Sequence, residues 1–297
     1  MSKLSVNMLS DCFLTVLLWC LFVVRVVSGV TDQEIQSFTE EILKSDTSGL
    51  SNLVRYNKQG RAQSSKDSAS QPLLNVDERA FQNPTITALR ALFDNYDPDV
   101  THNEIVTDAE RQEEIKFINA VMETPVMKLT YEFSKQKGLF RGGQTTFKKW
   151  LAQVWFSMYS RGSRARGSSA FEHVFLGEIK NHQVIGLHNW VYFNDQENHG
   201  SLNYLGWKRY LDFGKGSLVK VHFKWNNVDK PVSSLFVGTS PELELALYSV
   251  CYLARPGKEC MIRLNGQPLV IQSHTFQRGP NLVIGSIYPD ELRQSSL

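Results

Sequence analysis

"FEHVFLGEIKNHQVIGLHNW", residues 171–190, decides how the second half of the chain is interpreted, because it places two histidines within one apolar stretch. We interpret the stretch as two strand-like runs, 172–180 and 184–193. If Asn181-His182 is a two-residue turn, His188 lies opposite Phe175. Alternate residues of a strand share a face, so His173 and His188 become diagonal neighbours on one side of a hairpin.

Two imidazoles on one face suit paired proton transfer, in which one ring takes a proton while the other gives one. Two other interpretations stay open on the residues alone. The histidines could be structural, or they could form a metal cluster with Glu172 and Glu178, since imidazole and carboxylate both bind transition metals. No G-x-S-x-G, C-x-x-C or phosphate-binding glycine motif offers a competing site.

Before this stretch, the pattern is mainly helical. Thr31 with Glu34 and Thr107 with Glu110 form capping boxes, each followed by apolar residues at helical spacing. Helices are predicted over residues 31–45, 84–93, 107–122 and 147–162.

After this stretch, the pattern is mainly that of strands. Asn265-Gly266 is a strong hairpin signal, and Ser240-Pro241 predicts the start of a single helix among the strands. Strands are predicted over residues 217–225, 231–238, 260–264, 268–274 and 281–288. The fold class predicted is therefore α+β, with antiparallel sheets and packed helices. We expect one domain, 30–297, with a mainly helical lobe (30–165) and a β-rich catalytic lobe (166–297).

The first 29 residues are typical of a secretory signal peptide. Lys3 precedes a short apolar run that ends in small residues at Ser28-Gly29. A membrane anchor is the alternative, but Arg25 interrupts the run before it reaches the length of a span. We expect secretion and no stable membrane association after cleavage. An oxidising route makes a disulfide between Cys251 and Cys260 plausible.

Composition excludes some functional classes. With 42% hydrophobic residues in 297, the chain is globular rather than disordered. Its formal net charge of +2 provides no global field that would attract a polyanion. Residues 126–180 are nevertheless rich in Lys and Arg, which allows a local basic surface beside the histidines, although such runs are more commonly solvated faces.

Longer motifs carry a family resemblance. "SRGSRARGSSAFEHVFLGEIK", "GLHNWVYF", "KPVSSLFVGTSPELELALYSVCY" and the ending "GSIYP" resemble the EndoU family of poly(U)-preferring endoribonucleases, in particular its secreted arthropod-type members. "LFDNYDPDVTHNE" and "TDAERQEEIKFINAVMETPVM" in the first half resemble the same family. The resemblance extends over roughly residues 31–290.

The resemblance implies roles for particular residues. His173, His188 and Lys230 match the family's catalytic residues, and a parallel with the nidovirus uridylate-specific endoribonuclease domain makes His188 the base and His173 the acid. Glu172 and Glu178 match acidic positions that support the histidines or contact a metal, either Mn²⁺ or Ca²⁺. The positions implied for substrate binding are Gly186, Ser234, Ser286 and Tyr288.

The function implied is a secreted, monomeric endoribonuclease that cleaves single-stranded RNA at uridylates and leaves 2′,3′-cyclic phosphate ends. The 2′-hydroxyl of RNA is the nucleophile, so the chemistry does not require a metal. Two alternatives are a catalytically inactive, secreted RNA-binding protein and a metal-dependent hydrolase that uses the His/Glu cluster.

Overall fold

The computed structural model describes residues 29–63, 66–162, 164–278 and 281–292. The predicted signal peptide, apart from Gly29, lies outside these residues. The helices are α2 (Asp32–Ser45), α3 (Pro84–Arg90), α4 (Asp108–Met122), α5 (Pro125–Gln136), α6 (Gln144–Phe156), α7 (Trp190–Asn198) and α8 (Pro241–Ala254), with short turns η1 (Leu50–Leu53), η2 (Glu78–Gln82) and η3 (Glu172–Leu176).

The strands form four antiparallel groups: β1–β2, β3–β4, β5–β6–β7 and β10–β9–β8. The strands are β1 (Val54–Tyr56), β2 (Leu74–Val76), β3 (Glu178–Lys180), β4 (Gln183–Ile185), β5 (Leu202–Asp212), β6 (Ser217–Trp225), β7 (Val228–Val237), β8 (Cys260–Leu264), β9 (Gln267–Arg278) and β10 (Asn281–Glu291). The predicted α+β class is confirmed.

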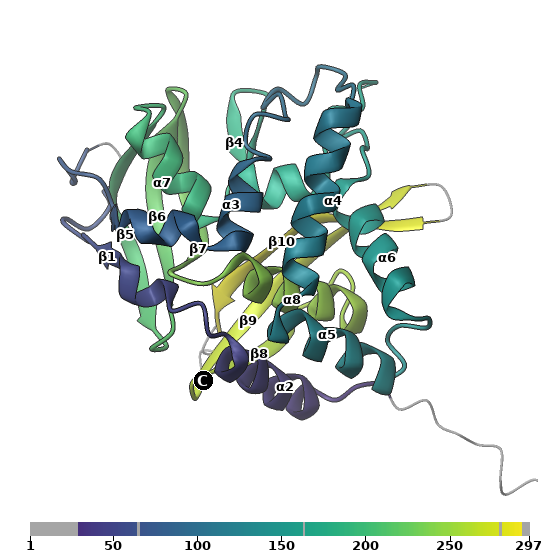
Figure 1. The fold of residues 1–297 in the computed structure, drawn as a ribbon. Helices are drawn as coiled ribbons and strands as arrows, with labels where there is room; N and C mark the ends of the chain where they lie inside the picture. Colours follow the sequence, from purple (N-terminus) through teal and green to yellow (C-terminus); the bar gives the residue numbers. More distant parts are fainter. Residues whose placement is uncertain (1–28, 64–65, 163, 279–280, 293–297) are drawn as a thin grey trace, which may run out of the picture.

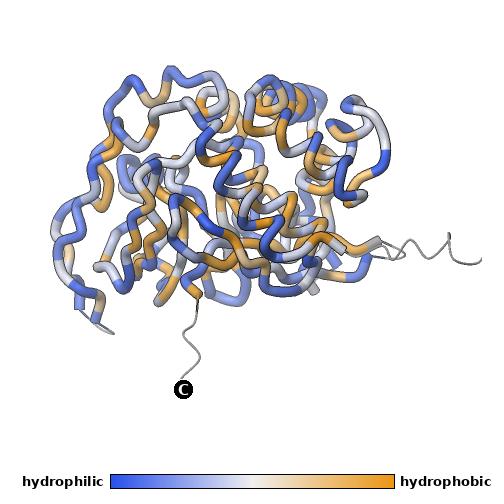
Figure 2. The backbone as a smooth tube through the Cα atoms, turned by 90° about the horizontal axis from the view of Figure 1, so that it is seen from below, coloured by the Kyte–Doolittle hydropathy of each residue, from blue (hydrophilic) through white to orange (hydrophobic). Residues whose placement is uncertain are grey.

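The helices that precede the sheets pack around α8, which lies near the middle of the molecule in Figure 1. Most of α8 is buried because its apolar residues continue around the whole helix instead of following one stripe. The outer helices alternate between hydrophobic and hydrophilic residues along the chain (Figure 2), as expected of helices with one buried face. None of the helices within the described ranges combines the length and apolar composition of a membrane span.

Several local predictions are confirmed. Both capping boxes are present, at Thr31–Glu34 and Thr107–Glu110. The Ser240 side chain caps α8, which begins at Pro241. The Asn265-Gly266 turn joins β8 to β9, and the Cys251–Cys260 disulfide ties the end of α8 to the start of β8.

Two predicted strands were wrong. Residues 172–180 begin with the helical turn η3, and β3 occupies the last three positions alone. Residues 184–193 end in α7, whose start is fixed by the Asn189 side chain accepting from the Val191 and Tyr192 N–H groups. Both stretches are buried along most of their length, and such runs fit a buried helix as well as a strand.

Two further differences concern the end of one helix and two elements that were not predicted. The helix predicted over 147–162 ends at Phe156, because the chain then becomes extended and the Tyr159 N–H donates to the Ser168 carbonyl. α5 and the long strand β5 were not predicted. The lobe boundary near residue 165 stays a prediction.

Candidate active site

The residues named from the sequence meet where the two three-stranded sheets approach each other through β7 and β10. His173 comes from η3, and His188 from the segment between β4 and α7. Lys230 and Ser234 lie on β7, whereas Ser286 and Tyr288 lie on β10. The site is thus assembled from four separate elements.

The predicted turn and register of the β3–β4 hairpin are confirmed, since Lys180 pairs with Gln183 and Glu178 with Ile185. The hairpin is short, however, and neither histidine lies within a strand. Their rings nevertheless come together, with centroids 6.5 Å apart and planes inclined by 56°.

Backbone hydrogen bonds join the two histidine segments. The Leu187 N–H donates to the His173 carbonyl at 3.0 Å, and the His188 N–H donates to the Val174 carbonyl at 2.8 Å. Gly186 permits this approach, because a Cβ at that position would lie 1.7 Å from the His173 carbonyl oxygen. Gly186 also has a φ of 69°, which favours glycine.

His173 is held from both ring nitrogens. Its Nδ1 lies 2.7 Å from Glu178 Oε2, and its Nε2 lies 3.0 Å from Ser286 Oγ. Burial acts to raise the pKa of the Glu178 carboxyl, but His173, Arg161 and Ser168 outweigh it, and this pKa is lowered. An ionised Glu178 accepts from Nδ1–H, so Nε2 of the neutral ring faces Ser286 as an acceptor.

Arg161 is a site residue that the sequence analysis did not identify. Its buried guanidinium lies 2.7 Å from Glu178 Oε2 and donates to the Ser168 hydroxyl at 2.8 Å. It also donates to the carbonyl of Gly285, the residue before Ser286, at 2.7 Å. One cation therefore ties the carboxylate behind His173 to the strand that carries Ser286. The cluster of arginines just before the first histidine was the available signal.

His188 is held by β7 and β10. Its Nδ1 donates to the Ser234 carbonyl oxygen at 2.7 Å, so Nε2 is the lone-pair nitrogen of the neutral ring. Tyr288 stacks on the imidazole, with centroids 4.8 Å apart and planes 16° apart. The His274 ring also lies near Tyr288, with centroids 5.9 Å apart. Tyr288 thus positions a histidine in addition to its predicted role in substrate binding.

Lys230 supplies the positive charge of the site. Its Nζ donates to the Val184 carbonyl at 3.0 Å, which directs the side chain toward the histidine hairpin. Burial lowers the pKa of the Lys230 ammonium to about 8, so most of it stays charged at neutral pH.

Both imidazoles are neutral in the free protein. Burial, with the Arg161 charge second, lowers the pKa of His173 to about 4, although Glu178 opposes this shift. Burial and the Lys230 charge hold the pKa of His188 well below its usual value. His173 has a carboxylate partner and His188 has a neutral carbonyl, so His173 is the better placed of the two to hold a proton.

The donor set does not fit a metal ion at the two glutamates. The oxygens of Glu178 already accept from His173, Arg161 and Ser168. Glu172 is buried, and its oxygens have no hydrogen-bond partner among the described residues. Burial and the charges of Glu178 and Glu104 raise the pKa of Glu172 well above normal, which disfavours the charged carboxylate that a metal ion would need. No group of three His, Cys, Asp or Glu side chains suited to a metal occurs in the described ranges.

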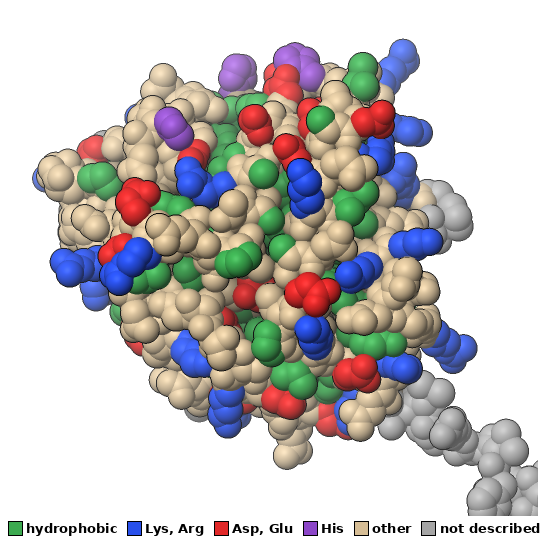
Figure 3. Space-filling model, in the orientation of Figure 1, with side chains coloured by type: hydrophobic (Ala, Val, Ile, Leu, Met, Phe, Trp, Pro, Cys, Tyr) green, Lys and Arg blue, Asp and Glu red, His purple; other side chains and the backbone are tan. Residues whose placement is uncertain are grey.

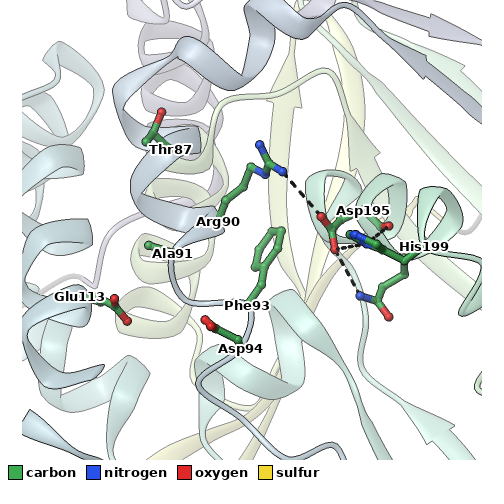
Figure 4. Close-up of a pocket in the computed structure, with 9 residues that line it drawn as sticks. Thr87, Arg90, Ala91, Phe93, Asp94, Glu113, Asp195 and His199 are labelled. Atoms are coloured by element: carbon green, nitrogen blue, oxygen red, sulfur yellow. Dashed lines mark hydrogen bonds and ion pairs between the residues drawn. The ribbon is translucent and has the colours of Figure 1, made fainter. Parts of the chain in front are cut away.

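A surface hollow of about 630 Å³ lies elsewhere, between α3, α4 and the end of α7 (Figure 4). Arg90 points across it toward Asp195, with 3.9 Å between the charged atoms, and Asp195 also contacts His199. None of the predicted site residues lines this hollow. Acidic and basic side chains are interspersed over the face shown in Figure 3, in keeping with the small net charge.

Comparison with known proteins agrees with the resemblance drawn from the motifs. Residues 34–289 match the family model described as "Endoribonuclease XendoU". The chain is 37% identical to the uridylate-specific endoribonuclease EndoU of Drosophila melanogaster over 268 residues, covering 88% of this chain and 83% of that protein. It is also 37% identical to the uridylate-specific endoribonuclease of Bos taurus, where the match covers 84% of this chain and 62% of the relative.

A solved structure described as "XendoU: a splicing independent snoRNA processing endoribonuclease" superposes with a TM-score of 0.73 at 34% identity. That match covers 87% of this chain and 96% of the solved chain. The motifs, the fold and the family match agree, and the chain belongs to the XendoU family of endoribonucleases.

Proposed function

We propose that this protein cleaves single-stranded RNA at uridylates by transesterification. The observation that supports this most directly is the pair of neutral imidazoles with centroids 6.5 Å apart, beside the ammonium of Lys230. Each imidazole has its Nδ1 held by a protein acceptor, so Nε2 carries the lone pair of each neutral ring; in His173 this nitrogen contacts the Ser286 hydroxyl.

In the proposed reaction, His188 Nε2 takes the proton of the 2′-hydroxyl. The 2′-oxygen then forms a bond to phosphorus, and the bond from phosphorus to the 5′-oxygen breaks. His173 gives a proton to the leaving 5′-oxygen, and Lys230 stabilises the charge on the phosphoryl oxygens. The products are a 2′,3′-cyclic phosphate and a 5′-hydroxyl.

The acid role of His173 requires a protonated ring, and the bound phosphate would supply the missing stabilisation. Its negative charge would raise the pKa of His173, and the Glu178 carboxylate would stabilise the imidazolium from the other side. Ser286 Oγ occupies the place at Nε2 that the leaving oxygen would take, so substrate would displace this contact. The backbone N–H of Gly186 is proposed to contact the phosphate, and the side chain of Ser234 is proposed to contact the uracil.

We further propose that the protein is secreted as a monomer after removal of residues 1–29. The disulfide between Cys251 and Cys260 supports an oxidising route, because such bonds persist mainly outside the cytosol. N-terminal sequencing of protein recovered from culture medium would test the cleavage position.

The test of activity uses the purified chain without residues 1–29 and two RNAs that differ at one uridine. The second RNA carries 2′-deoxyuridine there, which removes the nucleophile and should block cleavage. His173→Ala and Lys230→Ala should each lower the rate at least roughly 100-fold. His182→Asn, in the exposed turn of the same hairpin, is the matched control and should retain activity.

Cleavage of the deoxyuridine RNA would refute the mechanism. Binding of both RNAs with no cleavage of either would indicate the inactive RNA-binding alternative. A metal-dependent hydrolase would lose all activity in EDTA, whereas the proposed acid/base reaction should continue. Manganese and calcium are added back in parallel reactions, since either ion could act on RNA binding.

A further inference from the structure

The β9–β10 hairpin extends beyond the active site as an arm, drawn in yellow at the right of Figure 1. On this hairpin, His274 pairs directly with Ser286, whose hydroxyl contacts His173 Nε2. Paired residues of antiparallel strands share a face, so His274 lies on the face that carries the site. His274, Phe276 and Arg278 alternate along β9 and therefore share this face.

Phe276 is the large apolar side chain on this face, and 45% of it is exposed. The ring lies over Gly285, where a Cβ would come within 2.9 Å of a ring carbon. The Arg161 guanidinium lies 5.5 Å from the ring centroid, and the Tyr159 ring lies 6.1 Å away. Phe276 is thus a fixed ring with one side supported by protein and another open to solvent.

The ring is adjacent to the reacting groups. Gly285, which it covers, immediately precedes Ser286 in the chain. Arg161, which approaches the ring, also holds the Glu178 carboxylate behind His173. The exposed Arg278 lies two residues further along the same face of β9. An aromatic ring followed by a cation matches the stacking and phosphate contacts that single-stranded RNA requires.

From this arrangement we infer that Phe276 stacks against the base of the nucleotide on the 3′ side of the cleaved bond, with Arg278 beside the next phosphate. The inference rests on the proposed function, because the polarity follows from the proton roles. His173 protonates the 5′-oxygen of that nucleotide, so the nucleotide leaves the site on the His173 side. Phe276 lies on that side too. Ser286 contacts His173 Nε2, Gly285 precedes Ser286, and the Phe276 ring covers Gly285.

Stacking on a single ring accepts any base, since every base has a π-face. The protein would therefore require a uridine on the 5′ side of the cleaved bond. On the 3′ side it would require a base but would not discriminate among the four bases.

The experiment compares two short substrates that contain the same uridylate. One has adenine on the nucleotide that follows the cleaved bond, and the other has an abasic residue there. The wild-type protein should cleave the base-containing substrate with a kcat/KM about tenfold or more above that of the abasic one. Phe276→Ala should reduce this ratio to near one, and Phe276→Trp should keep or increase it.

Leu282→Ala is the matched control. Leu282 is 41% exposed on the same hairpin, but it pairs with Gln277 and so faces the opposite side. This variant should keep both the activity and the ratio of the wild type. Melting temperatures of all variants would show that each is folded. A third substrate, abasic on the 5′ side of the uridylate, tests polarity, and Phe276→Ala should leave its relative rate unchanged.

The outcomes separate the two proposals. If the wild type cleaves neither substrate, the proposed function fails. If the wild type cleaves both but Phe276→Ala keeps the full tenfold ratio, the proposed function stands and the stacking role is refuted. If Phe276→Ala instead abolishes the effect of the 5′ base, the polarity is overturned.

Discussion

The backbone of Gly186 lies directly against the carbonyl oxygen of His173, closer than any side chain would allow. This contact brings the two histidine-bearing segments within backbone hydrogen-bonding distance of each other. The geometry of the imidazole pair therefore depends on a residue without a side chain.

Gly186→Ala should lower the free energy of unfolding by more than about 2 kcal/mol, because the left-handed backbone and the close approach both disfavour a Cβ. Gly138→Ala is the control, since Gly138 has a similar φ of 68° but open space around its Cα. Denaturant unfolding gives the loss in free energy of unfolding for each variant. The difference between the two losses is the cost of placing a Cβ against the His173 carbonyl. Equal losses would show that backbone conformation alone is responsible.

The Glu178 carboxylate should be essential for stability as well as for catalysis. Glu178→Gln removes the charge opposite the buried Arg161 guanidinium, and breaking a buried pair in this way costs about 3–5 kcal/mol. Thermal unfolding should show a clearly lower Tm, and RNA cleavage should also fall. The exposed pair Asp77–Arg79 provides the comparison, and Asp77→Asn should leave the Tm unchanged. An unchanged Tm in Glu178→Gln would show that the buried Arg161–Glu178 ion pair does not stabilise the fold.

The pH dependence of kcat/KM should reflect the free-protein pKa values. His173 must be protonated to act as the acid, and its pKa is about 4, so kcat/KM should fall as pH rises above this value. The fall should steepen above about pH 8, where Lys230 loses its charge. Rates on a uridine dinucleotide across this range give the profile. A kcat/KM that rises steadily between pH 5 and 8 would contradict the requirement for a protonated His173 whose pKa is about 4.

Reduction of the Cys251–Cys260 disulfide should destabilise the fold without altering the site directly. The two residues are separated by 9 positions, and closure of such a loop is worth about 2–3 kcal/mol. Paired Cys251→Ser and Cys260→Ser substitutions should therefore lower the unfolding midpoint while leaving cleavage below that midpoint intact. A loss of activity in folded protein would mean that the β8–β9–β10 sheet needs this link to position Ser286.

The sequence by itself determined the elements whose signals are local. The capping boxes at Thr31 and Thr107, the Ser240-Pro241 helix start and the Asn265-Gly266 turn each involve neighbouring residues, so a short pattern suffices. The family resemblance was carried by motifs of the same kind, and the family match confirms it.

Tertiary structure alone decided how the predicted site residues meet. The run Glu172–Leu176 around His173 is buried at every position and became a helical turn, since burial from all directions does not distinguish helix from strand. The cluster of arginines before His173 did not show which of them is buried in the site, because the partners of Arg161, Glu178 and Gly285, lie far along the chain from one another. The position of β10 beside β7, which brings Tyr288 onto His188, follows from the packing of two sheets. Long-range contacts of this kind depend on how whole surfaces fit together, and no local pattern records that fit.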